Sequence, residues 1–327
     1  MLIKIINAVL AVLAGVGGAV VLFWVLNKAA DAFPMKARER IRPYLFILPA
    51  FLAIGLYLIY PAVQTVVYSF ANSRSTAFVG VANYRELLAS PSFQSTLLNT
   101  LLWITLVPVA TIVVGLLVAT LADRLRPRGE KLSKTLIFLP MAISAVGAGT
   151  IWRFVYASNP PGQQQVGLLN AGVVGLGGDP VAWLQMSDGK VNSLLLMVIL
   201  LWVQAGFAMV LLSAAIKGVP IDTLEAARID GAGERTVFFR IVVPQIRGTV
   251  ITVFVTVLIG VMKTFDIVYV MTNGNFDTNI IAVDFYNQLF TNGNTGYAAA
   301  IVVMLMVAII PIMIYQVRQF RAQEAQR

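Results

Sequence analysis

Residues 220–246 read PIDTLEAARIDGAGERTVFFRIVVPQI, a polar stretch within a chain of 327 residues that is otherwise strongly apolar. Hydrophobic runs flank it on both sides, at 193–215 and 249–271. Crossing the hydrocarbon core of a bilayer takes roughly 20 helical residues, and both runs reach that length. The stretch 220–246 is therefore predicted to be a loop between two membrane-spanning helices.

The loop itself is patterned as two short helices separated by glycines. Asp222 can cap the first helix, and Glu225 follows three residues later, as in a capping box. Gly231 and Gly233 interrupt that helix, and a second, amphipathic stretch runs to Pro244. A helix, a glycine break and another helix make a compact knob, which suits insertion into a groove on a partner protein.

Five more apolar runs accompany the two that flank the loop. From the N-terminus the seven runs are 5–26, 44–70, 98–122, 135–156, 193–215, 249–271 and 297–317. Charged residues make up only 12% of the chain, whereas soluble domains carry about 25%. No segment alternates with the period of a strand, and helices satisfy their own backbone hydrogen bonds in lipid. The predicted fold class is all-α, a polytopic membrane helical bundle.

The first run, 5–26, is longer than the apolar core of a secretory signal peptide, which spans roughly 7–15 residues. It is predicted to be a retained helix, with a cleaved signal peptide as the alternative. The segment 157–192 contains an apolar part, 167–184. This part is expected either to lie on the membrane or cap a cavity, or to be an ordinary outer loop.

Lysines and arginines are concentrated in alternate connections between the runs. The segments 28–42, 123–134 and 216–248 carry five each, and Arg318, Arg321 and Arg327 follow the last run. The positive-inside rule then places the N-terminus outside and the C-terminus in the cytoplasm. Most of the basic residues behind the net charge of +9 thus lie in predicted cytoplasmic loops, and no nucleic-acid partner is expected.

Several kinds of chemistry are excluded by composition. The chain has no cysteine and no histidine, which removes disulfides, Cys/His zinc sites and Ser-His-Asp or Cys-His catalysis. No Gly-x-x-x-x-Gly-Lys-Ser/Thr phosphate loop occurs either. The chain is therefore predicted to be neither an enzyme nor the holder of a cofactor or metal.

The loop at 220–246 resembles the EAA loop of ABC importer permeases. The residues that carry the resemblance are Glu225, Ala226, Ala227, Asp230, Gly231, Ala232, Phe238, Ile241 and Pro244. The resemblance implies that these residues form coupling helices docking into a cleft on a cytoplasmic ATPase, with Glu225 in contact and Gly231 permitting the turn. One departure is Arg235, which stands where an aromatic residue is common.

Further segments resemble carbohydrate permeases of the maltose and alpha-glucoside type over roughly residues 42–317. They are 42–50, 80–84, 98–101 (taken as the start of a helix), 265–272 and 296–300, whereas 273–276 departs from the usual glycines and proline. The resemblance implies an extra helix and charged hinge at 1–41, then a six-helix core at 42–327 with the coupling loop at 216–248. It also implies a second permease subunit, an ATPase dimer using ATP and Mg, an extracytoplasmic sugar-binding protein, and a bacterial inner membrane.

Polar and aromatic side chains within two runs are candidates for a substrate pathway. The run 193–215 offers Trp202, Gln204 and Phe207, and the run 249–271 offers Lys263, Thr264 and Asp266. Aromatic faces stack on sugars, and amide, hydroxyl and carboxylate groups bind their hydroxyls. Lys263 and Asp266 are three residues apart and can pair on one helix face, which lowers the cost of keeping both in the membrane. The alternatives are packing for the two aromatics, an interhelical hydrogen bond for Gln204, and a structural lock between helices for the Lys263–Asp266 pair.

The predicted function is import of a sugar or oligosaccharide, with an alpha-glucoside as the more specific prediction, by an ATP-driven complex of which this chain is the permease. Two alternatives stay open: an ion-coupled secondary transporter that uses Asp266, and an importer of glycerol-3-phosphate or a polyol. A phosphate would favour arginines in the pathway, and the runs 193–215 and 249–271 contain none. This favours a neutral sugar.

Overall fold

A computed structural model describes residues 2–160 and 162–324, and these residues are almost entirely helical. Arg327, one of the basic residues predicted to lie in the cytoplasm, falls outside them. The α-helices are α1 (Leu2–Asp31), α2 (Met35–Ile54), α3 (Tyr60–Tyr68), α4 (Ala82–Ala89), α5 (Pro91–Ala122), α6 (Pro127–Phe138), α7 (Ala145–Val155), α8 (Leu168–Gly175), α9 (Val191–Lys217), α10 (Ile221–Ile229), α11 (Glu234–Val237), α12 (Val243–Gln245), α13 (Arg247–Met262), α14 (Asp266–Met271), α15 (Ile281–Tyr286) and α16 (Thr295–Glu324).

Six shorter helical turns complete the secondary structure of the described residues. Three are π-helical: η1 (Gly55–Ile59), η5 (Phe238–Val242) and η6 (Asn287–Thr291). Three are 3₁₀ turns: η2 (Leu139–Ala142), η3 (Trp183–Gln185) and η4 (Asp188–Lys190). The only extended pairing found there is an isolated antiparallel bridge between Ala71 and Phe78. The all-α prediction is confirmed.

Long apolar helices account for the predicted membrane spans. Within the described residues five helices are long and apolar enough to cross a membrane, and the total reaches seven if each of two bent pairs is one span. The five are Ile3–Asp31, Met35–Tyr68, Pro91–Ala122, Asp188–Lys217 and Thr295–Tyr315. The bent pairs are Pro127–Ala142 with Ala145–Val155, at 106°, and Glu234–Gln245 with Arg247–Met262, at 69°.

Two of the predicted runs are broken rather than continuous helices. In the run 135–156, Ile143 is extended and Ser144 caps a new helix, accepting a hydrogen bond from the Gly147 amide at 3.1 Å. In the run 249–271, α13 ends at Met262 and α14 begins at Asp266. Hydropathy does not register such breaks, because the residues on both sides are equally apolar.

The described chain divides between Val67 and Tyr68 into two compact units. In the first unit, α1 and α2 form a hairpin in which the Phe23 and Phe46 rings stack at 5.7 Å. Arg42 Nη2 donates to Asn27 Oδ1 at 3.1 Å in the same hairpin. The boundary expected at 41/42 from the sequence stays a prediction.

The core of the second unit lies where α5, α9 and α13 pack together. Its largest fully buried side chains include Trp103, Leu196, Ile199 and Val253. Close approach depends on glycine: a Cβ at Gly206 would lie 2.6 Å from the Ile137 carbonyl oxygen, so α6 packs directly on the α9 backbone. Small residues at such crossings are typical of helix packing in membranes.

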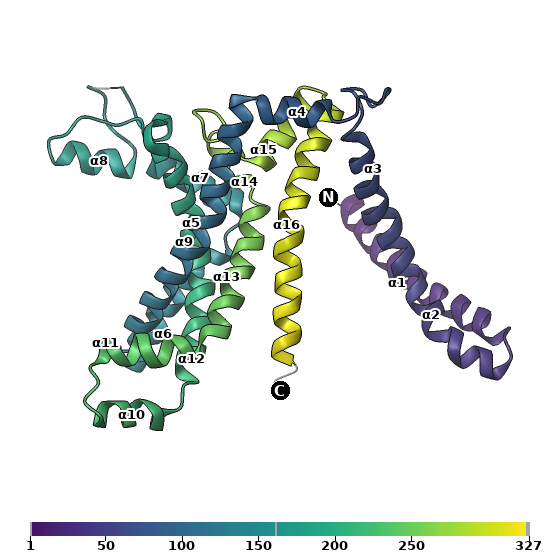
Figure 1. The fold of residues 1–327 in the computed structure, drawn as a ribbon, viewed down its shortest axis with the longest axis horizontal. Helices are drawn as coiled ribbons and strands as arrows, with labels where there is room; N and C mark the ends of the chain where they lie inside the picture. Colours follow the sequence, from purple (N-terminus) through teal and green to yellow (C-terminus); the bar gives the residue numbers. More distant parts are fainter. Residues whose placement is uncertain (1, 161, 325–327) are drawn as a thin grey trace. The chain divides into compact units, whose positions relative to one another are not determined.

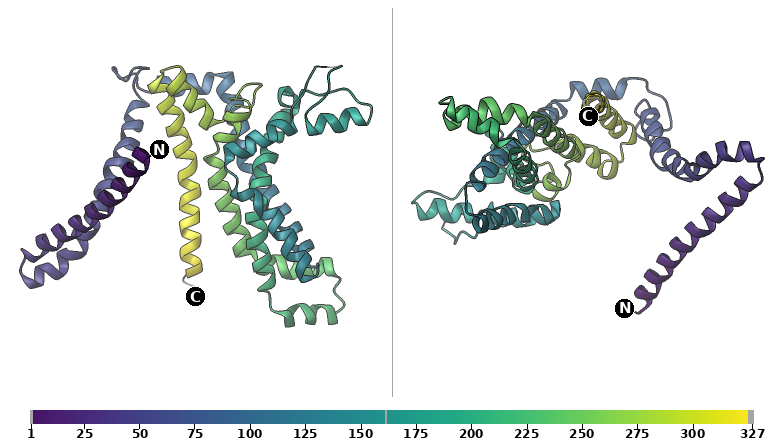
Figure 2. Two further views of the ribbon diagram at one scale, coloured as in Figure 1. Left: turned by 180° about the vertical axis from the view of Figure 1, so that it is seen from behind. Right: turned by 90° about the horizontal axis from the view of Figure 1, so that it is seen from below.

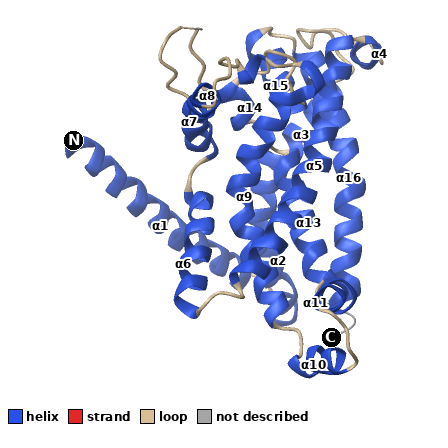
Figure 3. Ribbon diagram, turned by 90° about the vertical axis from the view of Figure 1, so that its left-hand side faces the viewer, coloured by secondary structure: helices blue, strands red, loops and turns tan. Residues whose placement is uncertain are grey.

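The second unit has two distinct ends. The helices α10, α11 and α12 lie at one end, which we call the α10 end, and α4, α14 and α15 lie toward the other, the α4 end (Figures 1 and 3). The helix α16 runs from one end to the other, as the reverse view in Figure 2 also shows. The helix α8 lies in the middle of the segment 157–192, and the buried Asn170 ties it to the Ala157 and Val181 carbonyl oxygens.

Candidate coupling loop and substrate pathway

The first helix of the predicted coupling loop, α10, begins differently from the prediction. Its N-cap is Pro220, which is extended (φ −57°, ψ 128°), and no side chain caps the helix. Asp222 instead lies within the first turn. The predicted capping role of Asp222 is therefore wrong. The last extended residue before the helix is Pro220, so the helix begins two residues before Asp222 could act as its N-cap. Its carboxylate still lies near the positive end of the helix dipole.

The glycine break of the loop is present at Gly231, whose φ is +81°. This left-handed conformation closes α10, since the Gly231 amide donates to the Arg228 carbonyl and the Ala232 amide to the Ala227 carbonyl, both at 3.0 Å. Glycine adopts it without the steric cost that a Cβ brings. Gly233, with φ −67°, has ordinary backbone.

The second half of the loop runs through α11, η5 and α12 to Gln245, one residue beyond the predicted end at Pro244. Pro244 lies inside α12 and has no N–H to donate. The turn before it, η5, is π-helical, which is how a helix accommodates an interrupted hydrogen-bond ladder.

The predicted coupling residues divide into an exposed set and a set that packs beneath it. Glu225, Ala226, Asp230, Gly231 and Pro244 are exposed, Ile241 is half-buried, and Ala227, Ala232 and Phe238 pack on a small core of Val219, Val237, Val242 and Ile246. Three apolar side chains of the loop are also exposed: Ile229 (85% exposed), Phe239 (67%) and Ile221 (66%). The loop therefore presents apolar as well as acidic groups at the α10 end.

A group of ion pairs links α6 and α9 with the end of α5. Lys134 Nζ lies 2.5 Å from Asp123 Oδ1, 2.7 Å from Glu130 Oε1 and 2.5 Å from Ser213 Oγ. Lys217 adds a second ion pair to Glu130. Through these contacts Asp123 directly after α5, the last turns of α9 and the first two turns of α6 are held together. None of these residues stood out in the sequence as a candidate for such contacts.

The predicted pairing of Lys263 with Asp266 is wrong. The two residues lie on either side of the break between α13 and α14, where Lys263 has φ −101° and Phe265 φ −133°. Spacing of three residues brings side chains together only on a continuous helix. Both side chains are exposed, and neither takes part in an ion pair within the described residues.

Gln204 and Thr264 each lie near Gly260, through different atoms of that residue. A Cβ on Gly260 would lie 3.6 Å from Gln204 Nε2, and Thr264 Oγ1 donates to the Gly260 carbonyl oxygen at 3.4 Å. The absence of a side chain at Gly260 thus leaves space next to the Gln204 amide. The predicted pathway residue Gln204 of α9 therefore faces the end of α13 at Gly260.

The two aromatic candidates on α9 pack against the core. The Trp202 ring meets the Trp152 ring edge to face at 5.8 Å. Phe207 packs against the same core cluster, and both residues are half-buried. These contacts agree with the packing alternative given above for the two residues.

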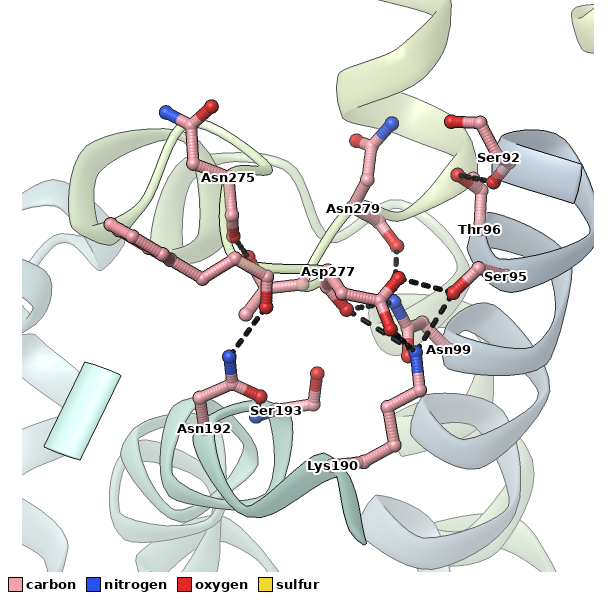
Figure 4. Close-up of polar contacts among 12 residues, drawn as sticks. Ser92, Ser95, Thr96, Asn99, Lys190, Asn192, Ser193, Asn275, Asp277 and Asn279 are labelled. Carbon is pink, nitrogen blue, oxygen red and sulfur yellow. Dashed lines mark hydrogen bonds and ion pairs between the residues drawn. The ribbon is translucent and has the colours of Figure 1, made fainter. Parts of the chain in front are cut away.

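A polar cluster at the α4 end is the largest feature that sequence reasoning missed (Figure 4). Lys190, just before α9, forms an ion pair with Asp277 and donates to Ser95 Oγ of α5 at 2.8 Å. Ser95 also donates to the Asp277 carboxylate. Burial alone would raise the pKa of Asp277, but hydrogen bonds from Lys190 and Ser95 hold that pKa below its usual value.

The same cluster holds the backbone of the loop between α14 and α15. Asn99 Nδ2 donates to the carbonyl oxygens of Asp277 (2.8 Å) and Asn279 (2.9 Å), and Asn192 Nδ2 donates to that of Phe276 (2.6 Å). Phe276 has φ +56°, which a bulky side chain rarely adopts. Buried amides thus fix an irregular loop in one conformation.

Asn99 was expected near the start of a helix, yet α5 begins at Pro91, and Asn99 is fully buried within it. A signal was available: Ser95 and Asn99 are four residues apart, on one face of an apolar helix. Polar side chains so placed within an apolar run indicate internal partners. The partners themselves, 178 and 180 residues later, could not be read from local pattern.

Comparison with known families identifies the class of protein. Residues 111–323 match the family described as binding-protein-dependent transport system inner membrane component. The chain belongs to this family.

Relatives of this inner membrane component span almost its whole length. The alpha-glucoside transport system permease protein AglF of Rhizobium meliloti is 44% identical over 329 residues, covering 96% of this chain and 97% of its own. The osmoprotective compounds uptake permease protein GgtC of Synechocystis is 46% identical over 283 residues, covering 86% of this chain and 100% of its own. Because the AglF alignment covers 96% of this chain, it includes most of the first unit.

Solved structures confirm the fold of this inner membrane component. The bacterial alginate ABC transporter in complex with an alginate pentasaccharide-bound periplasmic protein contains a chain with a TM-score of 0.72 and 20% identity. The match covers 86% of this chain and 94% of the other. The predicted permease fold is thereby confirmed.

Proposed function

We propose that this chain is the permease subunit of an ATP-driven importer for a neutral sugar or oligosaccharide, with an alpha-glucoside as the favoured substrate. Family membership and the similarity to AglF support this proposal. The observation that carries it is the loop 220–246, which presents Glu225 together with exposed Ile229 and Phe239 on a glycine-closed knob. Apolar side chains exposed beside charged ones are characteristic of a protein docking surface.

The partner of this knob is a cytoplasmic ATPase dimer, which binds ATP and Mg. The α10 end is then cytoplasmic and the α4 end extracytoplasmic, in agreement with the basic residues at 216–248. A second permease subunit and an extracytoplasmic sugar-binding protein complete the proposed assembly. The inward contacts of the knob, through Val237 and Val242, connect it to the helices that surround the pathway.

Substrate passes, in this proposal, beside Gln204, Gly260 and Thr264. The amide and hydroxyl can exchange hydrogen bonds with sugar hydroxyls, and Gly260 places no side chain beside the Gln204 amide. Lys263 and Asp266, exposed at the helix break, add two charged groups on the same path. No arginine lies in 193–215 or 249–271, which supports a neutral substrate over glycerol-3-phosphate.

Co-purification tests the coupling loop directly. The tagged chain is isolated from native membranes as wild type, Glu225→Lys and Gly231→Asp, with Glu86→Lys on the exposed face of α4 as the matched control. We expect an ATPase to accompany the wild type and the control, and to be lost or uncoupled from sugar in the two loop variants.

The opposite result would point to the ion-coupled carrier. In that case no ATPase accompanies any variant, and Glu225→Lys and Gly231→Asp transport as the wild type does. Uptake would then be abolished by Asp266→Asn and by collapse of the ion gradient, and the importer proposal would be abandoned.

A further inference from the structure

Four aromatic rings from three helical segments form a continuous group at the α4 end. Phe265 and Tyr269 stack with their centroids 4.8 Å apart and an interplanar angle of 22°. Tyr286 lies 5.1 Å from each of them, and Phe290 continues the series at 4.9 Å from Tyr286. We call these four residues the aromatic ladder.

The ladder differs from the buried aromatic core of the second unit because part of it remains exposed. Tyr269 is 36% exposed and Phe290 is 66% exposed, and Phe265 and Tyr286 are half-buried. Core aromatics such as Trp103 are almost completely buried. The ladder therefore has one side that packs in the fold and another on which ring faces and edges are accessible.

Two interruptions of helical geometry produce this arrangement. The break between α13 and α14 places Phe265 at the N-cap of α14, and Tyr269 follows four residues later on the same face. The π-turn η6 begins directly after Tyr286 and carries Phe290. π-turns within helices are frequent at functional sites.

Polar groups accompany the rings at both ends of the ladder. Phe265 is flanked in the chain by Thr264 and Asp266, both in the proposed pathway. On the η6 side, Asn292 Nδ2 donates to Gln288 Oε1 at 3.0 Å, close in sequence to Tyr286 and Phe290. Accessible rings beside amides and hydroxyls are the combination that recognises a carbohydrate, which has both apolar C–H faces and hydroxyls.

We propose that the aromatic ladder is a second carbohydrate-binding surface, outside the Gln204–Thr264 position, on which a neutral oligosaccharide stacks on its way into the pathway. This inference rests on the proposed function, because the α4 end must be extracytoplasmic. Several rings in series contact more than one sugar unit, so the ladder favours a trisaccharide over a monosaccharide.

The test uses the complete transporter in nanodiscs, without its binding protein, and measures saturation transfer by NMR to maltose, maltotriose, sucrose or trehalose, whichever the wild type transports. The variants are Tyr269→Ala and Phe290→Ala, with Tyr269→Phe and Phe290→Tyr as ring-preserving partners. Phe154→Ala on α7 is the matched control, since Phe154 is 69% exposed.

We expect sugar binding to weaken about three- to tenfold in each alanine variant, as the loss of one aromatic contact implies. Binding should be retained by the ring-preserving variants and the control. Unchanged sugar binding in both alanine variants overturns the proposal. So does a wild type that transports a sugar but gives no NMR saturation transfer to that sugar. Loss of the second permease subunit from Phe290→Ala, with sugar contacts unchanged, would assign the ladder to a subunit interface instead. A wild type that transports none of the four sugars would count against the proposed function itself.

Discussion

Lys190, at the start of α9, forms an ion pair with Asp277, which lies 87 residues later in the loop between α14 and α15. The Lys190 side chain is 17% exposed and that of Asp277 47%. The pair joins two segments that the order of the chain does not bring together. Because Ser95 of α5 bonds to both residues, three separate elements meet at this one pair.

Removing the ion pair should loosen the loop without unfolding the protein. We expect Lys190→Ala to lower the free energy of unfolding by about 1 kcal/mol or less, because Asp277 is half-exposed and solvent screens the pair. The melting temperature of the purified protein measures this change. Asp188→Ala, two residues away and without an ion pair among the described residues, serves as the control. Equal shifts in the melting temperature of the two variants would show that the ion pair does not stabilise the loop.

The same pair predicts a pH dependence. The pKa of Asp277 is lowered in the folded state from its ordinary value of 3.8. A carboxylate with a lowered pKa contributes stability above that ordinary value and loses the contribution as the pH falls through the folded pKa. The melting temperatures of wild type and Asp277→Asn should therefore differ at neutral pH and converge in acid. A difference in melting temperature that grows in acid would refute the lowered pKa of Asp277.

Gly231 and Gly233 should respond differently to the same substitution. Gly231→Ala places a Cβ on a backbone with φ +81°, at a cost of about 1 kcal/mol, and should distort the end of α10. Gly233→Ala, at φ −67°, should be tolerated. Sugar-stimulated ATP hydrolysis by the assembled transporter measures the effect, and equal activity of the two variants would argue against the left-handed turn.

Gly206 is a position where only glycine fits. In Gly206→Ala the new Cβ would meet backbone atoms of Ile137 and Phe138 at 2.6 Å, so α6 and α9 must separate. We expect a loss of about 1–3 kcal/mol in stability, as for an overpacked core. Gly260→Ala meets only Gln204 Nε2, at 3.6 Å, and should fold normally. Thermal unfolding of the two variants compares them directly, and similar melting temperatures would rule out the close crossing.

Replacing Gln204 should lower transport without affecting folding. In Gln204→Leu the volume is kept but the amide is lost, so one hydrogen bond to a sugar hydroxyl disappears, and uptake should fall about tenfold. Trp202→Phe, which keeps an aromatic packing group beside Trp152, should transport nearly as well as the wild type. Uptake of a labelled disaccharide by cells measures both, and an unaffected Gln204→Leu would remove this residue from the pathway.

Much of the fold could be predicted because it depends on composition and local pattern. Apolar length alone located the membrane helices, since the bilayer requires about 20 such residues in a row. The knob at 220–246 was also readable, because Gly231 and Pro244 act on the backbone at their own positions. The coupling residues themselves remain predictions until an ATPase contact is measured.

The misassignments share a physical cause. Lys263 and Asp266 were paired on the assumption of an unbroken helix, and hydropathy does not reveal where a buried helix breaks. Asn99 was read as a helix start, whereas it binds carbonyl oxygens far along the chain. Partners at such separation depend on how the helices cross, which no local window contains.

The sequence by itself therefore determined the all-α membrane class, the absence of cysteine and histidine chemistry, and the family-defining loop, because each follows from residue type and short-range spacing. Tertiary structure alone decided which polar side chains meet. It joined Lys190 to Asp277, and placed Gln204 beside Gly260. It also gathered Phe265, Tyr269, Tyr286 and Phe290 into one group. In an apolar chain, helices pack through many similar surfaces, and only the folded arrangement selects among them.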